Sequence, residues 1–282
     1  MDDKQYDVAI AYRIYPKVSK VPPVFSDDKF KLSELCLKSF KESLGVLKIK
    51  MFVILDNCPP EYSELFKKYF DEKDLTFYQL PGIGNGRTFG KQVEILSEQN
   101  YSEYVYFAED DYFYLPDTFI EMLSFLKDNP EVDFITPYDH LDIYTLDLHN
   151  YKSNVIISGK RHWRTISCSC MTFLTTKEIL GKTKKVFMTY TRNNTDAGLW
   201  MSLTKMKIFN LFSVIRHINK ESFAVKIFLK AWWFSFFRIL FGKKRNLYVP
   251  IPTIATHMDN KYLAPGYDWD EIFNAKISEM KD

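Results

Sequence analysis

The sequence predicts an α/β fold with a mostly parallel central sheet flanked by helices, and two observations lead to this class. Short apolar stretches typical of buried strands alternate along the chain with stretches that repeat apolar residues at helical spacing. Such alternation indicates crossovers between parallel strands, in a sheet that is covered on both faces. The length of 282 residues and the 46% of hydrophobic residues suit one large α/β domain or two small ones.

The predicted elements follow one another in a regular order. The predicted strands cover residues 6–12, 49–57, 75–80 and 104–108. The predicted helices cover residues 32–45, 61–70, 91–99 and a stretch that begins at Pro116 and Asp117, whereas the glycine-bearing residues 81–90 are predicted as a turn. Further along, residues 158–180 predict a strand and a helix, and residues 197–206 predict a helix capped by Asn193 to Thr195.

Composition and charge bear on the class of function. The formal net charge of +2, from 38 basic and 36 acidic residues, gives no overall attraction to nucleic acid. The first residues, MDDKQYDVAI, are acidic where a signal peptide is basic, so we expect a cytoplasmic protein. The four cysteines lack the CxxC spacing of a zinc site. We predict that Cys168 and Cys170 are small buried residues on one face of a strand.

The stretch YVYFAEDDYFYLPD at residues 104–117 ends a strand in three adjacent carboxylates, Glu109, Asp110 and Asp111. Neighbouring acids repel one another, and an unpaired charge that leaves water costs several kcal/mol. Capping of the next helix is one explanation, but Pro116 and Asp117 already begin that helix. We therefore favour a metal or phosphate site.

Polar residues follow the predicted strands. They are Arg13, Asp56 with Asn57, Asn85 to Arg87, and Glu109 to Asp111. Ligands of parallel sheets bind beyond the carboxyl ends of the strands, so one rim of the sheet should collect these side chains. The stretch GIGNGRTFG fits neither GxGxxG nor GxxxxGK[ST], which argues against Rossmann dinucleotide and P-loop chemistry. The pattern favours a nucleotide site in which a metal neutralises the phosphate charge.

With these motifs, the chain resembles the GT-A glycosyltransferases, in particular those of family 2. EDD at residues 109–111 occupies the place of the family's DxD motif, and GNGRTFGKQ resembles the family's segment before the following helix. The resemblance implies a UDP- or GDP-sugar donor and Mn²⁺ or Mg²⁺, with Asp111 as a ligand of the metal that bridges the diphosphate. The nucleotide-sugar contacts that it implies are Ala11, Tyr12, Arg13, Asp56, Asn85, Gly86, Arg87, Glu109 and Asp110.

The resemblance also implies catalytic groups from the C-terminal half. A further metal ligand is often a histidine near the C-terminus, and His257 follows a predicted strand in IPTIATHMDN. A carboxylate base is expected at a helix start, where Asp196 is the candidate. A structural histidine and a first-turn acid that stabilises the helix dipole are the alternatives. The family's usual Glu-Asp pair is absent at this place. The QxxRW motif of processive synthases is also absent, so we expect a single-addition enzyme. With Asp196 as the base, we expect a single displacement that inverts configuration.

Acceptor contacts are expected from Trp163 and Arg164, and from Asp139 in the loop after DFITPY. Core packing of Trp163 and a solvated turn around Asp139 are equally open. The expected acceptor is a glycan or a lipid-linked molecule. The proposed division of the chain is a catalytic core at 1–210, with a nucleotide-sugar half at about 1–115 and an acceptor half at about 116–210, a helical segment at 211–247, and the remainder of the site at 248–282.

The segment FAVKIFLKAWWFSFFRILFGKKRN at residues 223–246 is aromatic and basic, and it is too interrupted to span a bilayer. Helical spacing places Lys226 and Lys230 on one face and Trp232 and Trp233 largely elsewhere, which is typical of an interfacial helix on an anionic membrane. A helix packed against the core is the alternative. We expect peripheral membrane association through this segment.

Two other functions stay open. A nucleotidyltransferase also combines a nucleotide-binding sheet with paired acids, but it usually carries a glycine-rich loop after its first strand, and AYRIYPKVSKVPPVF has no glycine. A non-catalytic glycan-binding module on the same fold is the second alternative. Release of nucleoside diphosphate from nucleotide sugars separates the three functions.

Overall fold

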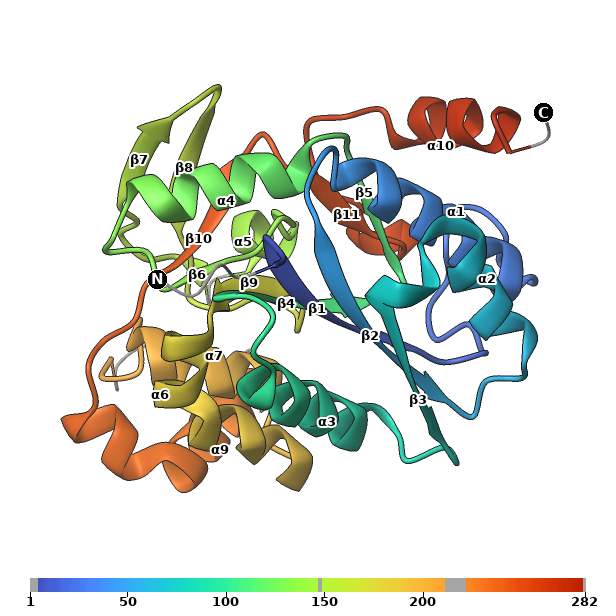
Figure 1. Cartoon of the computed structure of the whole chain (residues 1–282). Coiled ribbons are helices and arrows are strands. Elements are labelled where there is room, and N and C mark those ends of the chain that lie inside the picture. The colour runs from blue at the N-terminus through green and yellow to red at the C-terminus, as the bar shows by residue number, and fades with distance from the viewer. Residues whose placement is uncertain (1–4, 147–148, 211–221, 281–282) are drawn as a thin grey trace.

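The computed structural model describes residues 5–146, 149–210 and 222–280. Within them, a nine-stranded sheet in the order β3-β2-β1-β4-β9-β6-β10-β8-β7 forms the centre, and helices lie on both of its faces (Figure 1). Its strands are β1 (Val8–Ile14), β2 (Ile49–Asp56), β3 (Leu75–Leu80), β4 (Tyr104–Glu109), β6 (Phe134–Ile135), β7 (Val155–Ser158), β8 (Arg161–Thr165), β9 (Phe173–Thr176) and β10 (Leu247–Ile251). The predicted α/β class is confirmed.

The helices and a small second sheet complete the architecture. The helices are α1 (Lys29–Ser43), α2 (Glu61–Tyr69), α3 (Asn85–Glu98), α4 (Thr118–Asp128), α5 (Asp142–Thr145), α6 (Lys177–Phe187), α7 (Asp196–Thr204), α9 (Ser222–Phe241) and α10 (Trp269–Ser278). The second sheet pairs β5 (Tyr112–Tyr114) with β11 (Ala255–His257). β5 follows β4 after two residues, so β11 is held beside the carboxyl end of β4.

One half of the central sheet is parallel throughout. β1 pairs in parallel with β2 and with β4, and β2 pairs in parallel with β3. Every residue of β1 is buried, and successive side chains enter two separate cores: Ile10 packs in one and Ala11 in the other. This explains why the strand is a continuous apolar run rather than an alternating one.

The other half of the sheet is mixed. β9 pairs antiparallel with both β4 and β6, while β10 runs parallel to β6 and antiparallel to β8. β10 comes from the C-terminal part of the chain, so the sheet is completed only by residues far from β4 in sequence. The predicted strand at Cys168 and Cys170 is wrong, because both residues lie in the connection between β8 and β9. Their thiols are free and half-buried.

Residues 81–90 are not a turn over their whole length, because α3 already begins at Asn85. The glycines here allow helix packing as well as turning. A side chain at Gly90 would lie 2.6 Å from Thr191, and one at Gly86 would lie 3.2 Å from the carbonyl of Tyr190. Glycine therefore lets α3 approach the 3₁₀ turn η3 (Met188–Arg192) closely, and only Gly82 and Gly84 need the left-handed backbone of a turn.

The start of α4 also differs from the prediction. Asp117 precedes the helix as expected, but its backbone is left-handed, with a φ of 60°, and its side chain makes no capping hydrogen bond. The free backbone amides of α4 are therefore not capped by this carboxylate.

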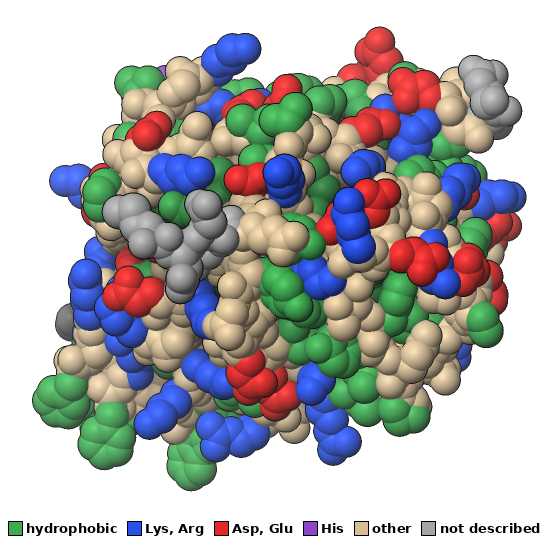
Figure 2. Space-filling model, viewed as in Figure 1, with side chains coloured by type: hydrophobic (Ala, Val, Ile, Leu, Met, Phe, Trp, Pro, Cys, Tyr) green, Lys and Arg blue, Asp and Glu red, His purple; other side chains and the backbone are tan. Residues whose placement is uncertain are grey.

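Helix α9 packs one face against α7 and leaves the other exposed. The buried residues are Ala224, Ile227, Phe228, Ala231 and Ile239, and the exposed ones are Leu229, Trp233, Phe236, Phe237, Leu240 and Phe241. Hydrophobic side chains project at the lower left of Figure 2, where α9 lies in Figure 1. Within the described residues, no helix is both long and apolar enough to cross a membrane. The first part of the segment predicted at 211–247, residues 211–221, lies outside the described residues.

Candidate active site

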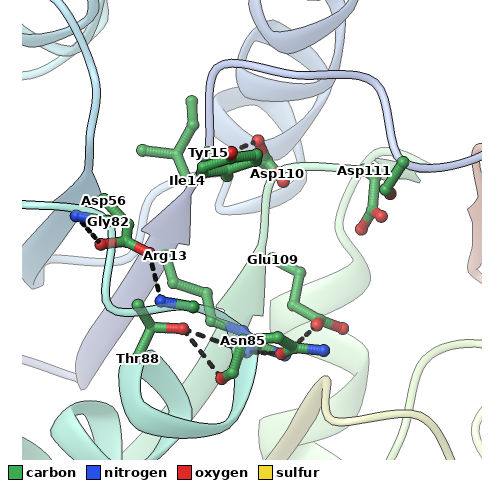
Figure 3. A pocket seen from close by; sticks show the side chains of 12 residues that line it. Arg13, Ile14, Tyr15, Asp56, Gly82, Asn85, Thr88, Glu109, Asp110 and Asp111 are labelled. Carbon is green, nitrogen blue, oxygen red and sulfur yellow. Dashed lines mark hydrogen bonds and ion pairs between the residues drawn. The ribbon is translucent and has the colours of Figure 1, made fainter.

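A cleft of about 330 Å³ opens at the carboxyl ends of β1, β2 and β4. The sequence predicted that polar strand ends would gather there, and the structure does bring them together (Figure 3). The residues that line the cleft are Arg13, Ile14, Tyr15, Ser19, Asp56, Gly82, Gly84, Asn85, Thr88, Glu109, Asp110 and Asp111. The volume is in the range of small-molecule sites.

Glu109, the first of the three acids, is paired with Arg13. The parallel register of β1 and β4 sets the two residues opposite each other, and their side chains form a buried ion pair. The second carboxylate oxygen of Glu109 accepts a hydrogen bond from Thr172 at 3.1 Å, and Arg13 also donates to the carbonyl of Asn85 at 2.8 Å. Both charges are therefore already satisfied by protein groups, and the pair ties the start of α3 to the sheet.

Asp110, the second acid, is paired with Lys29. The ammonium of Lys29 lies 2.8 Å from the carboxylate, and the backbone amide of Tyr15 donates to the same oxygen at 3.2 Å. Burial raises the pKa of Asp110, and the neighbouring Asp111 adds to this against the effect of Lys29. The pair fixes the loop after β1, which contributes Tyr15 and Ser19 to the cleft.

Sequence reasoning missed Lys29. A signal was present, because Lys29 precedes Leu32 and Cys36 at helical spacing and so belongs to the buried face of α1. A lysine on an apolar helix face needs an acidic partner.

Asp111, the third acid, differs from the other two in having an oxygen without a partner. Its Oδ2 lies 3.2 Å from Nε2 of His257, while its buried Oδ1 has no hydrogen-bond partner among the described residues. The pairing of β5 with β11 places His257 here, and the amide of Met258 donates to the carbonyl of Asp111 at 2.7 Å. The predicted proximity of Asp111 and His257 is therefore found in the structure.

The electrostatics of Asp111 follow from these neighbours. Burial alone would raise the pKa of Asp111, but His257, Lys29 and Arg13 outweigh it and hold the pKa well below its usual range. Burial would lower the pKa of His257, whereas Asp111 outweighs this and raises it. Asp111 is thus an ionised carboxylate at the edge of the cleft. In the described part of the chain, no set of three or more acidic, histidine or cysteine side chains is arranged to hold a metal.

Asp56 shapes the loop after β3. Its carboxylate accepts hydrogen bonds from the backbone amides of Gly82, Ile83 and Gly84 at 3.0, 2.7 and 2.9 Å. Only 3% of the residue is exposed. The carboxylate could accept a hydrogen bond from a base or a ribose only with the lone pairs that these three amides do not use. In the structure, Asp56 holds the loop that forms one wall of the cleft.

Four other predicted nucleotide-sugar contacts do not line the cleft. Ala11 and Tyr12 are buried in the cores on opposite faces of β1, because side chains alternate along a strand, so only their backbone is near the strand end. Gly86 packs against the carbonyl of Tyr190. Arg87 is exposed in the first turn of α3 and makes no hydrogen bond or ion pair with another described residue.

Asp196, the predicted base, is the first residue of α7. Thr195 caps the helix by accepting from the amide of Gly198 at 3.0 Å, and the Asp196 carboxylate accepts from the amide of Ala197 at 2.7 Å. Burial raises the pKa of Asp196, and the charge of Glu109 raises it further. Asp196 is not among the residues that line the cleft.

The predicted acceptor residues are engaged in packing and pairing. Trp163 is buried and stacks on Phe125 with 4.1 Å between ring centroids, so it presents no face to an acceptor. Asp139 is also buried, pairs with Arg164 at 2.7 Å and accepts a hydrogen bond from Tyr144. The turn around Asp139 is therefore anchored rather than solvated.

Comparisons with known proteins give distant likenesses only. No protein-family model and no curated protein matches this chain. The S. aureus protein TarS 1–349 is 12% identical over 83% of this chain and 81% of its own, with a TM-score of 0.45. The mannosyltransferase PcManGT from Pyrobaculum calidifontis, solved with GDP-Man and Mn²⁺, is 12% identical over 64% of this chain and 47% of its own, with a TM-score of 0.40.

A third solved structure belongs to another class of transferase. A cytidylyltransferase from Leptospira borgpetersenii serovar Hardjo-bovis is 11% identical over 64% of this chain and 63% of its own, with a TM-score of 0.34. This chain also spans only 33% of the TarS chain solved with UDP-GlcNAc. The function proposed below therefore rests on the geometry of this chain.

Proposed function

We propose that this chain is a metal-dependent glycosyltransferase that moves a sugar from a UDP- or GDP-sugar to a glycan or a lipid-linked acceptor. The observation that carries the proposal is the carboxylate of Asp111. It lies at the carboxyl ends of parallel strands, is ionised, borders a cleft of about 330 Å³, and has one oxygen without a partner. This is the position at which α/β sheets bind nucleotides.

The residues present fit Mn²⁺ or Mg²⁺ as the cofactor. Asp111 Oδ1 is an orphaned oxygen, and His257 is beside it. Two protein ligands suffice, because Mg²⁺ is commonly held by one or two carboxylates together with substrate phosphates. The bound cation would stabilise, as a Lewis acid, the negative charge on a departing nucleoside diphosphate.

The neighbouring charges have supporting roles in this proposal. Arg13 with Glu109, and Lys29 with Asp110, are neutral pairs that fix the cleft walls. Arg87 is the exposed cation at the start of α3, where its guanidinium can reach a phosphate of the donor. The free amides at the start of α3 favour an anion at the same place.

Asp196 is the proposed base for the acceptor hydroxyl. A raised pKa makes a carboxylate a stronger base, and burial supplies that shift here. Removal of the hydroxyl proton by Asp196 would let the oxygen attack the anomeric carbon directly, with inversion of configuration.

We further propose that the acceptor side faces an anionic membrane from the cytoplasmic side. Ten of the 38 basic residues and one of the 36 acidic residues lie between Asp196 and Asp259, so this segment carries a formal charge of +9 and the rest of the chain −7. The same segment contains the exposed aromatic face of α9. Apolar area with flanking cations is what interfacial binding requires.

The test is a panel of UDP- and GDP-sugars that includes UDP-GlcNAc and GDP-mannose, with release of nucleoside diphosphate as the readout. One donor should give release that EDTA abolishes and Mn²⁺ or Mg²⁺ restores. Full activity in EDTA would contradict the metal. Pyrophosphate formed from a nucleoside triphosphate and a sugar phosphate would identify a nucleotidyltransferase instead, and glycan binding without turnover would identify a binding module.

A further inference from the structure

A second pocket, of about 200 Å³, lies away from the cleft, directly after α9. It is lined by Lys152, Asn154, Thr165, Met206, Lys244, Arg245, Asn246 and Leu247. These residues come from the connection before β7, from β8, from the end of α7 and from the entry to β10. Among the described residues that line it, three are cationic and none is acidic.

Two of the cations have no partner among the described residues. Lys152 and Lys244 are exposed and form no ion pair or hydrogen bond with any described residue. Arg245 is different, because it is only 5% exposed and one of its nitrogens pairs with Asp133 at 2.7 Å. Its buried Nε nevertheless has no hydrogen-bond partner among the described residues. The pocket therefore combines unpaired positive charge with an unsatisfied donor, which a phosphate group would satisfy.

Two uncharged residues of the pocket suit the same ligand chemistry. Asn154 and Thr165 carry an amide and a hydroxyl, the groups that commonly donate to phosphate oxygens, whereas the side-chain amide of Asn246 already donates to the carbonyl of Glu131 at 3.1 Å. Arg245 is fixed in place, since its backbone amide donates to the carbonyl of Leu203 at 2.9 Å. The pocket thus combines one arginine that the protein holds in place with two exposed lysines.

The pocket adjoins the exposed apolar face of α9. Lys244 follows Phe241, the last residue of the helix, by three positions, which places the two within roughly 10 Å of each other. Phe237 and Phe241 are 76% and 78% exposed. Figure 2 shows Lys and Arg side chains next to the hydrophobic groups that project at the lower left. Apolar insertion and phosphate contact can therefore occur on the same surface.

We infer that this pocket binds the phosphate of an anionic membrane lipid, while Trp233, Phe237 and Phe241 enter the headgroup region beside it. The inference rests on the membrane association proposed above and adds a specific headgroup site to it. A lipid source is favoured over free phosphate because the pocket stands next to the exposed aromatic residues. The headgroup site would fix the depth and the rotation of the protein on the bilayer, and so the direction in which the cleft faces.

The experiment compares co-sedimentation of the full chain with three kinds of vesicle: phosphatidylcholine alone, phosphatidylcholine with phosphatidylglycerol, and phosphatidylcholine with oleate at matched surface potential. On oleate vesicles, which offer anionic charge without added phosphate, Lys152→Gln/Lys244→Gln should weaken binding by roughly thirtyfold, because each lysine contributes about 1 kcal/mol of surface attraction. On phosphatidylglycerol vesicles the loss should be clearly larger, because the contact with the lipid phosphate is lost as well.

The matched control is Lys226→Gln/Lys243→Gln, which removes the same charge from exposed positions outside the pocket. It should weaken binding to both anionic vesicles equally. If the pocket variant behaves like this control, the phosphate site is wrong while membrane association stands. No binding of the wild-type chain to any anionic vesicle overturns both.

A competition experiment with soluble sn-glycerol 3-phosphate distinguishes a lipid headgroup from a free phosphate ester. It should compete with phosphatidylglycerol vesicles for the wild-type chain and have no such effect on the pocket variant. Binding of sn-glycerol 3-phosphate without any vesicle binding would point to a free phosphate ester and overturn the lipid assignment. Release of nucleoside diphosphate with a soluble acceptor should be unchanged in the pocket variant, so failure here is separable from failure of the proposed glycosyl transfer.

Discussion

The cleft and helix α9 place their charged and aromatic residues in opposite ways. In the cleft, the charged groups are buried and paired: Arg13 with Glu109, and Lys29 with Asp110. On α9 and just after it, Trp233 is 84% exposed, and Lys244 is exposed and has no partner in the part of the chain that the structure describes. In the first region, the protein itself pairs these charges and leaves only single groups such as the Oδ1 of Asp111 without a partner among the described residues, whereas the second presents a whole face of side chains to the outside.

The difference has a physical origin. A buried charge without a partner costs several kcal/mol, so the fold must supply partners wherever the site needs buried carboxylates. An exposed lysine costs nothing, but a large exposed aromatic face marks a surface that meets another phase or molecule. In the cleft, the informative group is therefore the one left without a partner, the Oδ1 of Asp111. On α9, the informative feature is a whole face of hydrophobic side chains that no other described residue covers.

The largest expected effect comes from Asp111→Asn. Loss of the metal-binding charge should lower turnover by about a thousandfold or more while the fold is retained, because metal stabilisation of a leaving group is worth several kcal/mol of barrier. Nucleoside diphosphate release gives the rate, and Mn²⁺ titration gives the binding constant. Unchanged turnover would mean that Asp111 does not bind a catalytic metal and has only a structural role, like Glu109 and Asp110.

Asp196→Asn should come next, with turnover lowered by roughly 10²–10⁴-fold and donor affinity nearly unchanged, because a base acts on the acceptor in the transition state. Thr195→Ala is the matched control: it removes the cap of α7, costs about 1 kcal/mol of stability and leaves the carboxylate. Equal kinetic losses in the two variants would assign Asp196 to helix capping. NMR of the product should find inverted configuration.

Lys29→Met tests whether the paired charges of the cleft are structural. It leaves Asp110 buried and unpaired, which should lower the free energy of unfolding by about 3–5 kcal/mol. Lys29→Met/Asp110→Asn should recover much of this loss, because the uncompensated charge is gone. Denaturant unfolding measures both. Lys31→Met, on the exposed side of the same helix, should change stability by less than about 0.5 kcal/mol; a similar loss there would contradict the assignment.

The smallest effect on stability is expected at Trp233. Trp233→Gln should change the free energy of unfolding by less than about 0.5 kcal/mol, whereas Trp232→Gln should cost about 1–3 kcal/mol, because Trp232 is partly buried against the core of α7 and α9. The same Trp233 variant should weaken vesicle binding. A large loss of stability at Trp233 would mean that the exposed face is covered within the protein.

Much of the fold and part of the site could be read from the sequence because those signals are local. Alternating apolar stretches predicted the parallel strands from residue 6 to residue 108, since strand and helix periodicity is written in consecutive residues. The acids at 109–111 predicted a charged strand end for the same reason. The sequence could not predict which of the three acids is paired and which keeps a free oxygen. Their partners, Arg13, Lys29 and His257, come from other elements.

The sequence by itself determined the α/β class, the rim at which polar residues gather, and the aromatic and basic composition of the predicted helical segment at 223–246, most of which lies in α9. Only the tertiary structure decided that Trp163 is a core residue, that Asp56 holds a loop, and that α9 is buried on one face and open on the other. It also decided that Lys152 meets Lys244 at one pocket. The physical reason is range: periodicity and charge runs act between neighbours in sequence, whereas burial and pairing are set by strands such as β10 and β11, which join the sheets from more than 100 residues away.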